Sequence, residues 1–152
     1  MVNPVIQGRV YPPTAPYVVG REKVREFARA VHNESPLSHD PEMARSAGHR
    51  DVIAPATFPI VVQQATLEQL LADPEAEVDF SRVVHGDQRF IYARPVVAGD
   101  ELVGTMTVTA VKQLGGNAMV TCATEIVDEN GELVVTATST LVVRAADAEE
   151  AA

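Results

Sequence analysis

The segment HNESPLSHDPEMA, residues 32–44, brings together imidazole, carboxylate, amide and hydroxyl side chains within a short turn-forming stretch. An imidazole with a pKa near neutrality and a carboxylate within hydrogen-bond range can act as general acid and general base. Pro36 would stiffen the turn that holds such groups. The chemistry open to this loop therefore depends on which side chains occupy the positions that face a substrate.

Helical patterns flank the loop. In residues 21–31, REKVREFARAV, the apolar residues recur at i, i+3, i+4 and i+7, which is one stripe of a helix. Residues 40–48, DPEMARSAG, predict a short helix with Asp40 at its N-cap, Pro41 in its first turn and Gly48 at its end. We expect the loop to join these two helices.

The most apolar stretch of the chain follows the second helix. From Phe58 to Leu71 apolar side chains occupy nearly every helical face, except around Gln63, Gln64 and Glu68, which is typical of a buried helix at the centre of a domain. From residue 83 the apolar period changes to two. Four segments rich in Val, Thr and Ile predict strands, at residues 83–96, 99–114, 117–129 and 131–144.

Helices followed by an antiparallel meander predict an α+β domain over residues 1–144. A single sheet wrapped around one long helix is the hot-dog arrangement. Its exposed edges favour pairing with a second subunit, which extends the sheet. Residues 145–152, AADAEEAA, have little to bury, and we expect a disordered tail there.

Four segments carry a resemblance to a known family: YVVGREKVREFARAVHNESP (17–36), AGHRDVIAPATF (47–58), DQRFIYARPVVAGD (87–100) and DENGELVVTATSTLV (128–142). Together they resemble the MaoC-like (R)-specific hydratase and dehydratase branch of the hot-dog superfamily. Within it, the chain is most similar to the A-type, non-catalytic subunits of actinobacterial (3R)-hydroxyacyl-ACP dehydratases. The resemblance implies a lyase-family role in fatty acid metabolism.

Active members of that branch carry a loop of the form Asp-x-Asn-Pro-Leu/Ile-His-x-Asp-Pro-Glu. When residues 40–42 are matched to its final Asp-Pro-Glu, Asn33 takes the aspartate position and Ser38 the histidine position. An amide cannot act as a base, and a serine hydroxyl needs an activating neighbour. The resemblance therefore implies no catalytic residue in this chain. His39, one residue later, is the fallback candidate, with Glu34 or Asp40 as its neighbour.

The segment IAPATF, residues 53–58, leads into the expected central helix. Backbone N–H groups at a helix N-terminus can hold the carbonyl oxygen of a thioester. We expect substrate binding by Pro55, Ala56, Thr57 and Phe58; a capped core helix is the alternative, and both can hold. The polar residues 49–51 are either a solvated loop or a contact to a partner or carrier.

Charge and composition exclude several other classes. The formal net charge of −9 argues against nucleic acid, and no apolar stretch is long enough to span a membrane. Residues 1–50, however, carry seven Lys or Arg against five Asp or Glu, so this first third could meet an acidic acyl carrier protein, or form a solvated helix face. Cys122 is the one cysteine, which fits a core residue in a cytoplasmic protein. We expect no metal and no cofactor, since ligand-spaced clusters and Gly-rich phosphate loops are absent.

Three hypotheses follow. The first is an acyl-binding subunit of an (R)-3-hydroxyacyl-thioester dehydratase, paired with a catalytic hot-dog chain in a heterodimer. The second is a self-sufficient hydratase that uses the displaced His39. The third is a standalone acyl-thioester binding module that forms a homodimer. The acyl group could be carried by CoA or by a carrier protein in each case.

Overall fold

The computed structural model of the protein describes residues 1–145 of the 152-residue chain, so residues 146–152 of the expected tail lie outside it. Its elements, in chain order, are the 3-10 helix η1 (Pro4–Ile6), β1 (Tyr17–Val18), α1 (Arg21–Ala30), η2 (Pro36–Ser38), α2 (Pro41–Ser46), α3 (Ile60–Ala72), η3 (Phe80–Arg82), β2 (Val83–Tyr92), β3 (Glu101–Leu114), β4 (Asn117–Val127) and β5 (Leu133–Val143).

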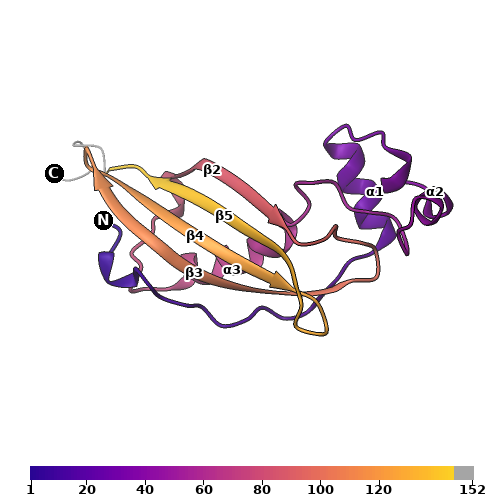
Figure 1. Ribbon diagram of the computed structural model, residues 1–152. Helices are drawn as coiled ribbons and strands as arrows, with labels where there is room; N and C mark the ends of the chain where they lie inside the picture. Colours follow the sequence, from indigo (N-terminus) through magenta and orange to yellow (C-terminus); the bar gives the residue numbers. More distant parts are fainter. Residues whose placement is uncertain (146–152) are drawn as a thin grey trace.

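The sheet has the strand order β1-β3-β4-β5-β2, and all its pairs are antiparallel. It curls along α3, which covers one of its faces, while α1 and α2 form a separate lobe beyond one end of the sheet (Figure 1). The expected α+β hot-dog architecture is therefore confirmed. The first predicted strand, residues 83–96, ends four residues early, at Tyr92, because the chain turns through Pro95 toward β3.

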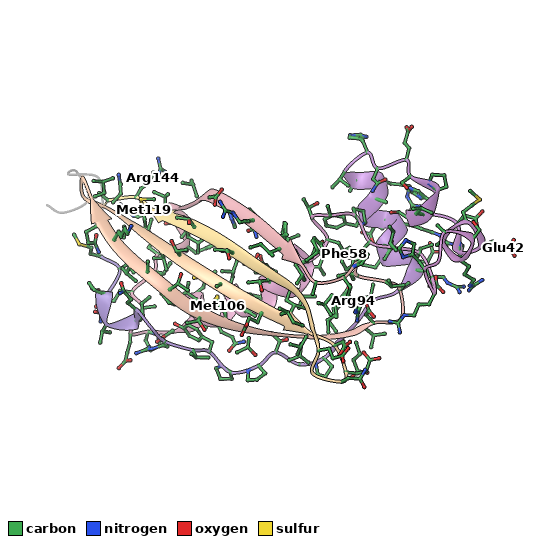
Figure 2. All side chains as sticks on the ribbon, in the orientation of Figure 1. Glu42, Phe58, Arg94, Met106, Met119 and Arg144 are labelled. Carbon is green, nitrogen blue, oxygen red and sulfur yellow. The ribbon has the colours of Figure 1, made fainter. Side chains whose placement is uncertain are left out.

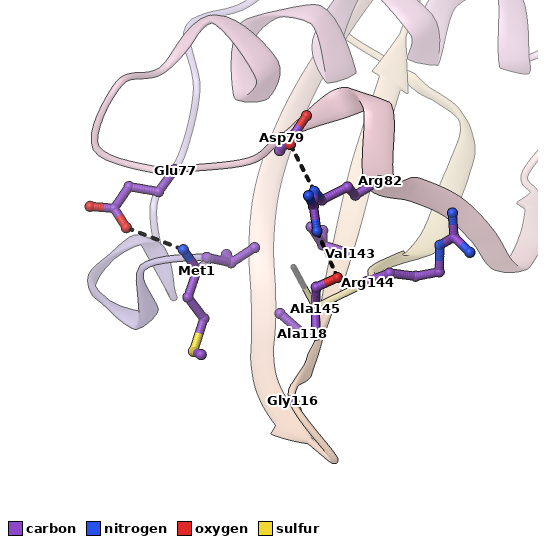
Figure 3. Close-up of a pocket in the computed structure, with 10 residues that line it drawn as sticks. Met1, Glu77, Asp79, Arg82, Gly116, Ala118, Val143, Arg144 and Ala145 are labelled. Carbon is purple, nitrogen blue, oxygen red and sulfur yellow. Dashed lines mark hydrogen bonds and ion pairs between the residues drawn. The ribbon is translucent and has the colours of Figure 1, made fainter. Parts of the chain in front are cut away.

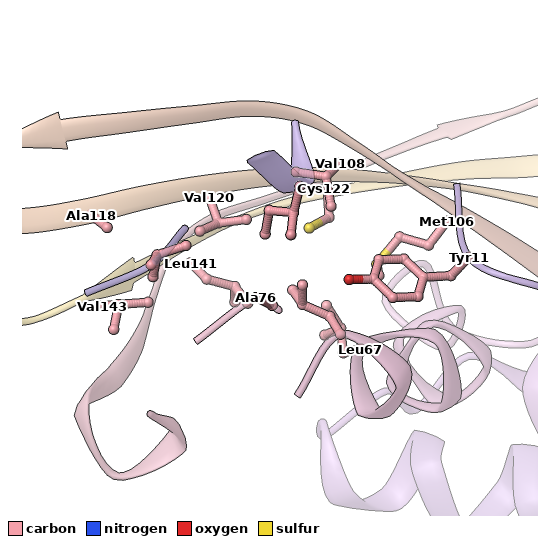
Figure 4. Packing of buried hydrophobic residues seen from close by; sticks show 13 residues of the cluster. Tyr11, Leu67, Ala76, Met106, Val108, Ala118, Val120, Cys122, Leu141 and Val143 are labelled. Carbon is pink, nitrogen blue, oxygen red and sulfur yellow. The ribbon is translucent and has the colours of Figure 1, made fainter. Parts of the chain in front are cut away.

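The helix α3 packs on the sheet through two apolar clusters. One cluster contains Leu67, Met106 and Cys122 (Figure 4), and the other contains Phe58 and Val62. Fully burying a side chain as large as Phe58 contributes about 2–3 kcal/mol. Burial also raises the pKa of the Cys122 thiol to about 12, which confirms its prediction as an unreactive core residue.

A buried polar layer separates the two clusters. On α3, Gln63 and Thr66 lie between the apolar contacts and are fully buried. The Gln63 side-chain amide donates to the carbonyl oxygen of Ala137 over 3.2 Å, and the hydroxyls of Thr66 and Thr124 lie 3.1 Å apart. These bonds satisfy polar groups that would otherwise be costly to bury.

Of the three polar residues that interrupt the expected buried helix, Gln63 is buried, whereas Gln64 and Glu68 form part of an open face in the single chain. Gln64, Ala65 and Glu68 of α3 are exposed, and they lie on the side of the helix away from the sheet. The helix also begins at Ile60 rather than Phe58, because a turn held by the Phe58 N–H bond to Pro55 O precedes it. A central helix with one open face suits a chain whose fold continues into a second subunit.

The two edges of the sheet differ. The β3 edge is covered by the N-terminal segment, in which Gly8 N donates to Val108 O, Tyr11 N to Met106 O and Thr14 N to Gly104 O. The β2 edge pairs with β5 on one side and with no other strand among residues 1–145. One edge of the sheet is therefore left open.

Candidate functional site

The predicted polar loop lies between α1 and α2 and contains the single turn η2. Helix α1 ends with His32 in the left-handed region, at a φ of 55°, and Asn33 N then donates to Ala28 O over 2.8 Å. This αL termination reverses the chain into the loop. At its other end Asp40 caps α2, as predicted, by accepting from Glu42 N at 2.8 Å.

Asn33 and Ser38, the two loop residues that the resemblance aligns with the family's acid and base, have different surroundings. Ser38 is 2% exposed, and its hydroxyl donates to the carbonyl oxygen of Ile53 over 2.8 Å. Asn33 is half-buried, and its side-chain oxygen accepts from Ser35 N at 2.9 Å. A backbone bond from Ile53 N to Leu37 O, 2.9 Å long, ties the loop to the segment before α3. Both residues therefore have fixed places beside that segment.

Asn33 and Ser38 line the same hollow, which has a volume of about 440 Å³. Its wall comes from the loop, from the segment before α3 and from the end of β2; the full lining is Asn33, Ser35, Ser38, Ile53, Ala54, Pro55, Ala56, Tyr92, Ala93, Arg94 and Pro95. Within residues 1–145, this lining contains no carboxylate and no imidazole. Its volume is that of a small-molecule site.

Tyr92 connects the open strand edge to this hollow. It stands at the end of β2, and its hydroxyl donates to the carbonyl oxygen of Ala56 over 2.7 Å. Burial raises the pKa of Tyr92 to about 12, so the phenol stays protonated at neutral pH. It can donate a hydrogen bond but cannot act as a base there.

The fallback residue His39 lies outside the lining of the hollow. Its Nε2 atom lies 2.7 Å from the backbone oxygen of Asn33, and its own backbone oxygen accepts from Arg25 Nε over 2.8 Å. No hydrogen bond joins its ring to Glu34 or Asp40 in the part of the chain that the structure describes. His39 thus contacts the backbone of one lining residue, Asn33, but is not itself part of the lining.

The four expected substrate-binding residues divide into two pairs. Pro55 and Ala56 line the hollow, whereas Thr57 is exposed outside its lining. Phe58 is fully buried, and its ring centroid lies 5.3 Å from that of Phe27. The backbone N–H groups of Ala56 and Thr57 donate to no acceptor within residues 1–145, so they are available to a ligand or to water.

A buried ion network holds the wall of the hollow in place. Asp100 is fully buried and accepts from Arg94 at 2.9 and 3.2 Å, from Arg50, and from Val97 N at 2.8 Å. Arg94 also donates to Asp128 over 3.1 Å. Burial alone would raise the pKa of Asp128, but Arg94 and nearby backbone N–H groups outweigh it and hold that pKa below its usual value.

Two of the polar residues 49–51, Arg50 and Asp51, take part in these structural contacts. Asp51 accepts from Arg21 at the start of α1, and this bond holds the pKa of its carboxyl at about 2. Arg50 reaches Asp100. Figure 2 shows Arg94 at the end of the sheet nearest the helical lobe, with Phe58 close to that lobe.

Residues 92–95 are functional candidates that sequence reasoning missed. They lay inside a segment that carried the family resemblance, but nothing in their types pointed to a site. Pro95, three residues after the end of β2, was the one available signal, because a proline does not continue a central strand and the chain that leaves the sheet there can form part of a wall.

Other parts of the molecule offer less chemistry. A hollow of about 550 Å³ lies at the opposite end, lined by Met1, Glu77, Arg144 and their neighbours (Figure 3). Among residues 1–145 no cluster of three His, Cys, Asp or Glu side chains is placed to hold a metal ion. In the same range, no helix has the length and apolar character needed to cross a membrane.

Comparisons with known proteins relate this chain to a dehydratase family. Residues 6–137 match the family described as "FAS1-like, dehydratase domain region". A UPF0336 protein of Leifsonia xyli subsp. xyli is 67% identical over 143 residues, which are 94% of this chain and 96% of that protein.

Two solved structures are similar in both sequence and fold. A chain in the crystal structure of the C-terminally truncated HadBC (3R-hydroxyacyl-ACP dehydratase) complex from Mycobacterium tuberculosis is 34% identical, with a TM-score of 0.79, over 90% of this chain and 96% of that chain. A MaoC-like dehydratase is 33% identical, with a TM-score of 0.83, over 93% of this chain and 43% of that longer chain.

Proposed function

Because this chain belongs to the family of FAS1-like dehydratase regions, we propose that it binds the acyl thioester of an (R)-3-hydroxyacyl dehydratase or enoyl hydratase. A second hot-dog chain would carry out the proton transfers. The proposal rests on one observation above the others. An amide, Asn33, and a hydroxyl, Ser38, line the hollow, and the family resemblance aligns these two residues with the ionisable groups that the chemistry needs.

The reaction requires two proton transfers. In the hydration direction, water oxygen bonds to the β-carbon, a base takes a proton from that water, and an acid delivers a proton to the α-carbon. Asn33 has no carboxylate, Ser38 has its hydroxyl engaged with Ile53 O, and Tyr92 keeps its proton at neutral pH. The hollow can therefore receive the substrate without turning it over.

Binding of a thioester needs only donors and apolar walls, and the hollow offers both. The free N–H group of Ala56 can donate to a carbonyl oxygen, and that of Thr57 follows directly along the chain. Ile53, Ala54, Pro55 and Ala93 supply apolar surface for the acyl chain. These features favour a short acyl thioester as the ligand.

The partner in this proposal is a hot-dog chain that carries Asp and His at the loop positions. The open β2 edge offers a place for it, and Tyr92 links that edge to the hollow. The similar HadBC chain is itself part of a complex, a (3R)-hydroxyacyl-ACP dehydratase, which supports a paired assembly for this chain. Exposed arginines of the helical lobe, such as Arg29, suit an acidic acyl carrier protein.

Filling the hollow tests the binding step. We expect Ala93→Trp to weaken binding of crotonyl-CoA at least about tenfold, because the indole takes space that the acyl group needs. Ala93 is exposed, so the larger side chain leaves the fold intact. Isothermal titration calorimetry on the isolated chain measures the effect.

The matched control is Ala30→Trp, at an exposed position of α1 outside the lining of the hollow. It should bind as the unmodified chain does. Equal affinity of both variants for crotonyl-CoA would place the acyl site elsewhere.

A further inference from the structure

We propose that Tyr92 is a positioning residue: its hydroxyl, bonded to the carbonyl oxygen of Ala56, fixes the direction of the Thr57 N–H group and so presents that donor to a thioester carbonyl. The inference rests on the function proposed above and adds a residue of β2 to the binding of the thioester. Tyr92 acts through the backbone and does not itself transfer a proton.

The turn before α3 is held by bonds that span three residues. Phe58 N donates to Pro55 O over 2.9 Å, and Ile60 N donates to Thr57 O over 3.2 Å. Every peptide bond of the described chain is trans and planar, so a bond that fixes a carbonyl oxygen also fixes the N–H group on the opposite side of the same peptide unit. The bond to Pro55 O therefore orients the N–H group of Ala56.

The next peptide unit, between Ala56 and Thr57, lacks such a bond from within the turn. The donor that would continue the series is the N–H group of residue 59, but Pro59 has none. The Tyr92 hydroxyl takes its place and donates to Ala56 O over 2.7 Å. Because burial raises the pKa of Tyr92 to about 12, this donor is present at neutral pH. The direction of the Thr57 N–H group thus depends on a side chain from β2.

This direction matters because the N–H group has no acceptor of its own. Neither Ala56 N nor Thr57 N donates to an acceptor within residues 1–145. Successive N–H groups at the start of a helix can hold one oxygen atom, and both Ala56 and Tyr92 line the hollow. A donor that must be ordered when the ligand arrives weakens binding. Tyr92 orders this donor beforehand.

Removing the hydroxyl tests the role of Tyr92. In isothermal titration calorimetry of the full chain, Tyr92→Phe should weaken binding of crotonyl-CoA at least about threefold, the usual effect of one lost hydrogen bond. Binding of crotyl-CoA, the thioether in which a methylene replaces the carbonyl, should stay unchanged, because it offers no oxygen to the Thr57 N–H group. A merely structural role would weaken the binding of both ligands alike.

Tyr17→Phe is the matched control. The Tyr17 hydroxyl has no hydrogen-bond partner within residues 1–145, and Tyr17 lies outside the lining of the hollow. This variant should bind both ligands as the unmodified chain does.

A second substitution should rescue the first. Pro59→Ala supplies the missing N–H group, and residue 59 already has helical dihedral angles, a φ of −59° and a ψ of −14°, that alanine adopts readily. The double variant Tyr92→Phe/Pro59→Ala should therefore bind crotonyl-CoA within about twofold of the unmodified chain. Without ligand, the NMR order parameter of the Thr57 amide should fall below about 0.85 in Tyr92→Phe and recover in the double variant.

The outcomes separate this inference from the function on which it rests. An unmodified chain that does not bind crotonyl-CoA would overturn the proposed function and this inference with it. If the unmodified chain binds, three results would overturn the role of Tyr92 alone: equal affinity of Tyr92→Phe for crotonyl-CoA, an equal loss for the thioether, or no rescue by Pro59→Ala.

Discussion

Replacing Asp100 by Asn should lower the free energy of unfolding by about 3 kcal/mol, the largest stability loss expected from a single isosteric change in this chain. Asp100 is fully buried and joins Arg50 from the loop before α3, Arg94 from the wall of the hollow, and Val97 N. Asparagine keeps the shape but removes the negative charge. The arginines are partly exposed, at 55% and 34%, so water offsets some of the loss.

Urea unfolding measures this loss, and it corresponds to a fall in Tm of about 6–12 °C for a domain of this size. The matched control is Glu101→Gln, at the next position of the chain, where the side chain is exposed and forms no ion pair within residues 1–145. It should change the stability by less than about 0.5 kcal/mol. Equal midpoints for the two variants would mean that the network does not hold the loop to the sheet.

The sequence predicted those features of the fold that depend on local periodicity. The stripe of α1, the cap at Asp40, the change to strand period near residue 83 and the hot-dog class all follow from apolar spacing and turn residues. The polar residues Gln64 and Glu68 marked part of the open face of α3, but its full extent could not be read in the same way. Its exposed residues include the apolar Ala65. The sequence alone does not distinguish an alanine that a partner would cover from an alanine in the core of the same chain.

The site was predictable only in part, for a physical reason. Asn33 and Ser38 could be placed by the register of the loop, and Pro55 and Ala56 by the approach to α3. Tyr92 and Arg94 come from the far end of β2, and only tertiary packing brings them to the loop. The contact of His39 with Asn33 O could not be predicted either, because the turn η2 replaces the extended chain on which sequence spacing is judged.

Adding a catalytic hot-dog chain should raise hydration of a crotonyl thioester at least about 100-fold above this chain alone, because positioned acid and base groups each contribute about 10²–10⁴-fold. The partner should carry the intact Asp and His loop. Substituting the Asp or the His of the partner's loop should abolish this increase in the hydration rate. The measurement is the loss of enoyl-thioester absorbance in the mixture, with the two chains equimolar.

Substitutions in this chain provide the controls for that mixture. His39→Ala should leave the turnover of the mixture within about twofold, since His39 lies outside the lining of the hollow. Ala93→Trp should reduce turnover through a higher KM, in line with its position in the wall. A mixture no faster than its separate components would argue against the proposed division of labour.

The most direct test of the central claim is the hydration rate of a crotonyl thioester with the purified chain alone, followed from about pH 5 to about pH 9, where histidine and perturbed carboxyl groups titrate. Because an amide and a hydroxyl stand at the two loop positions, we expect a rate equal to that of the thioester in buffer at every pH. A bell-shaped rate profile that disappears in the His39→Ala variant would contradict it, because it would show that this chain moves protons by itself.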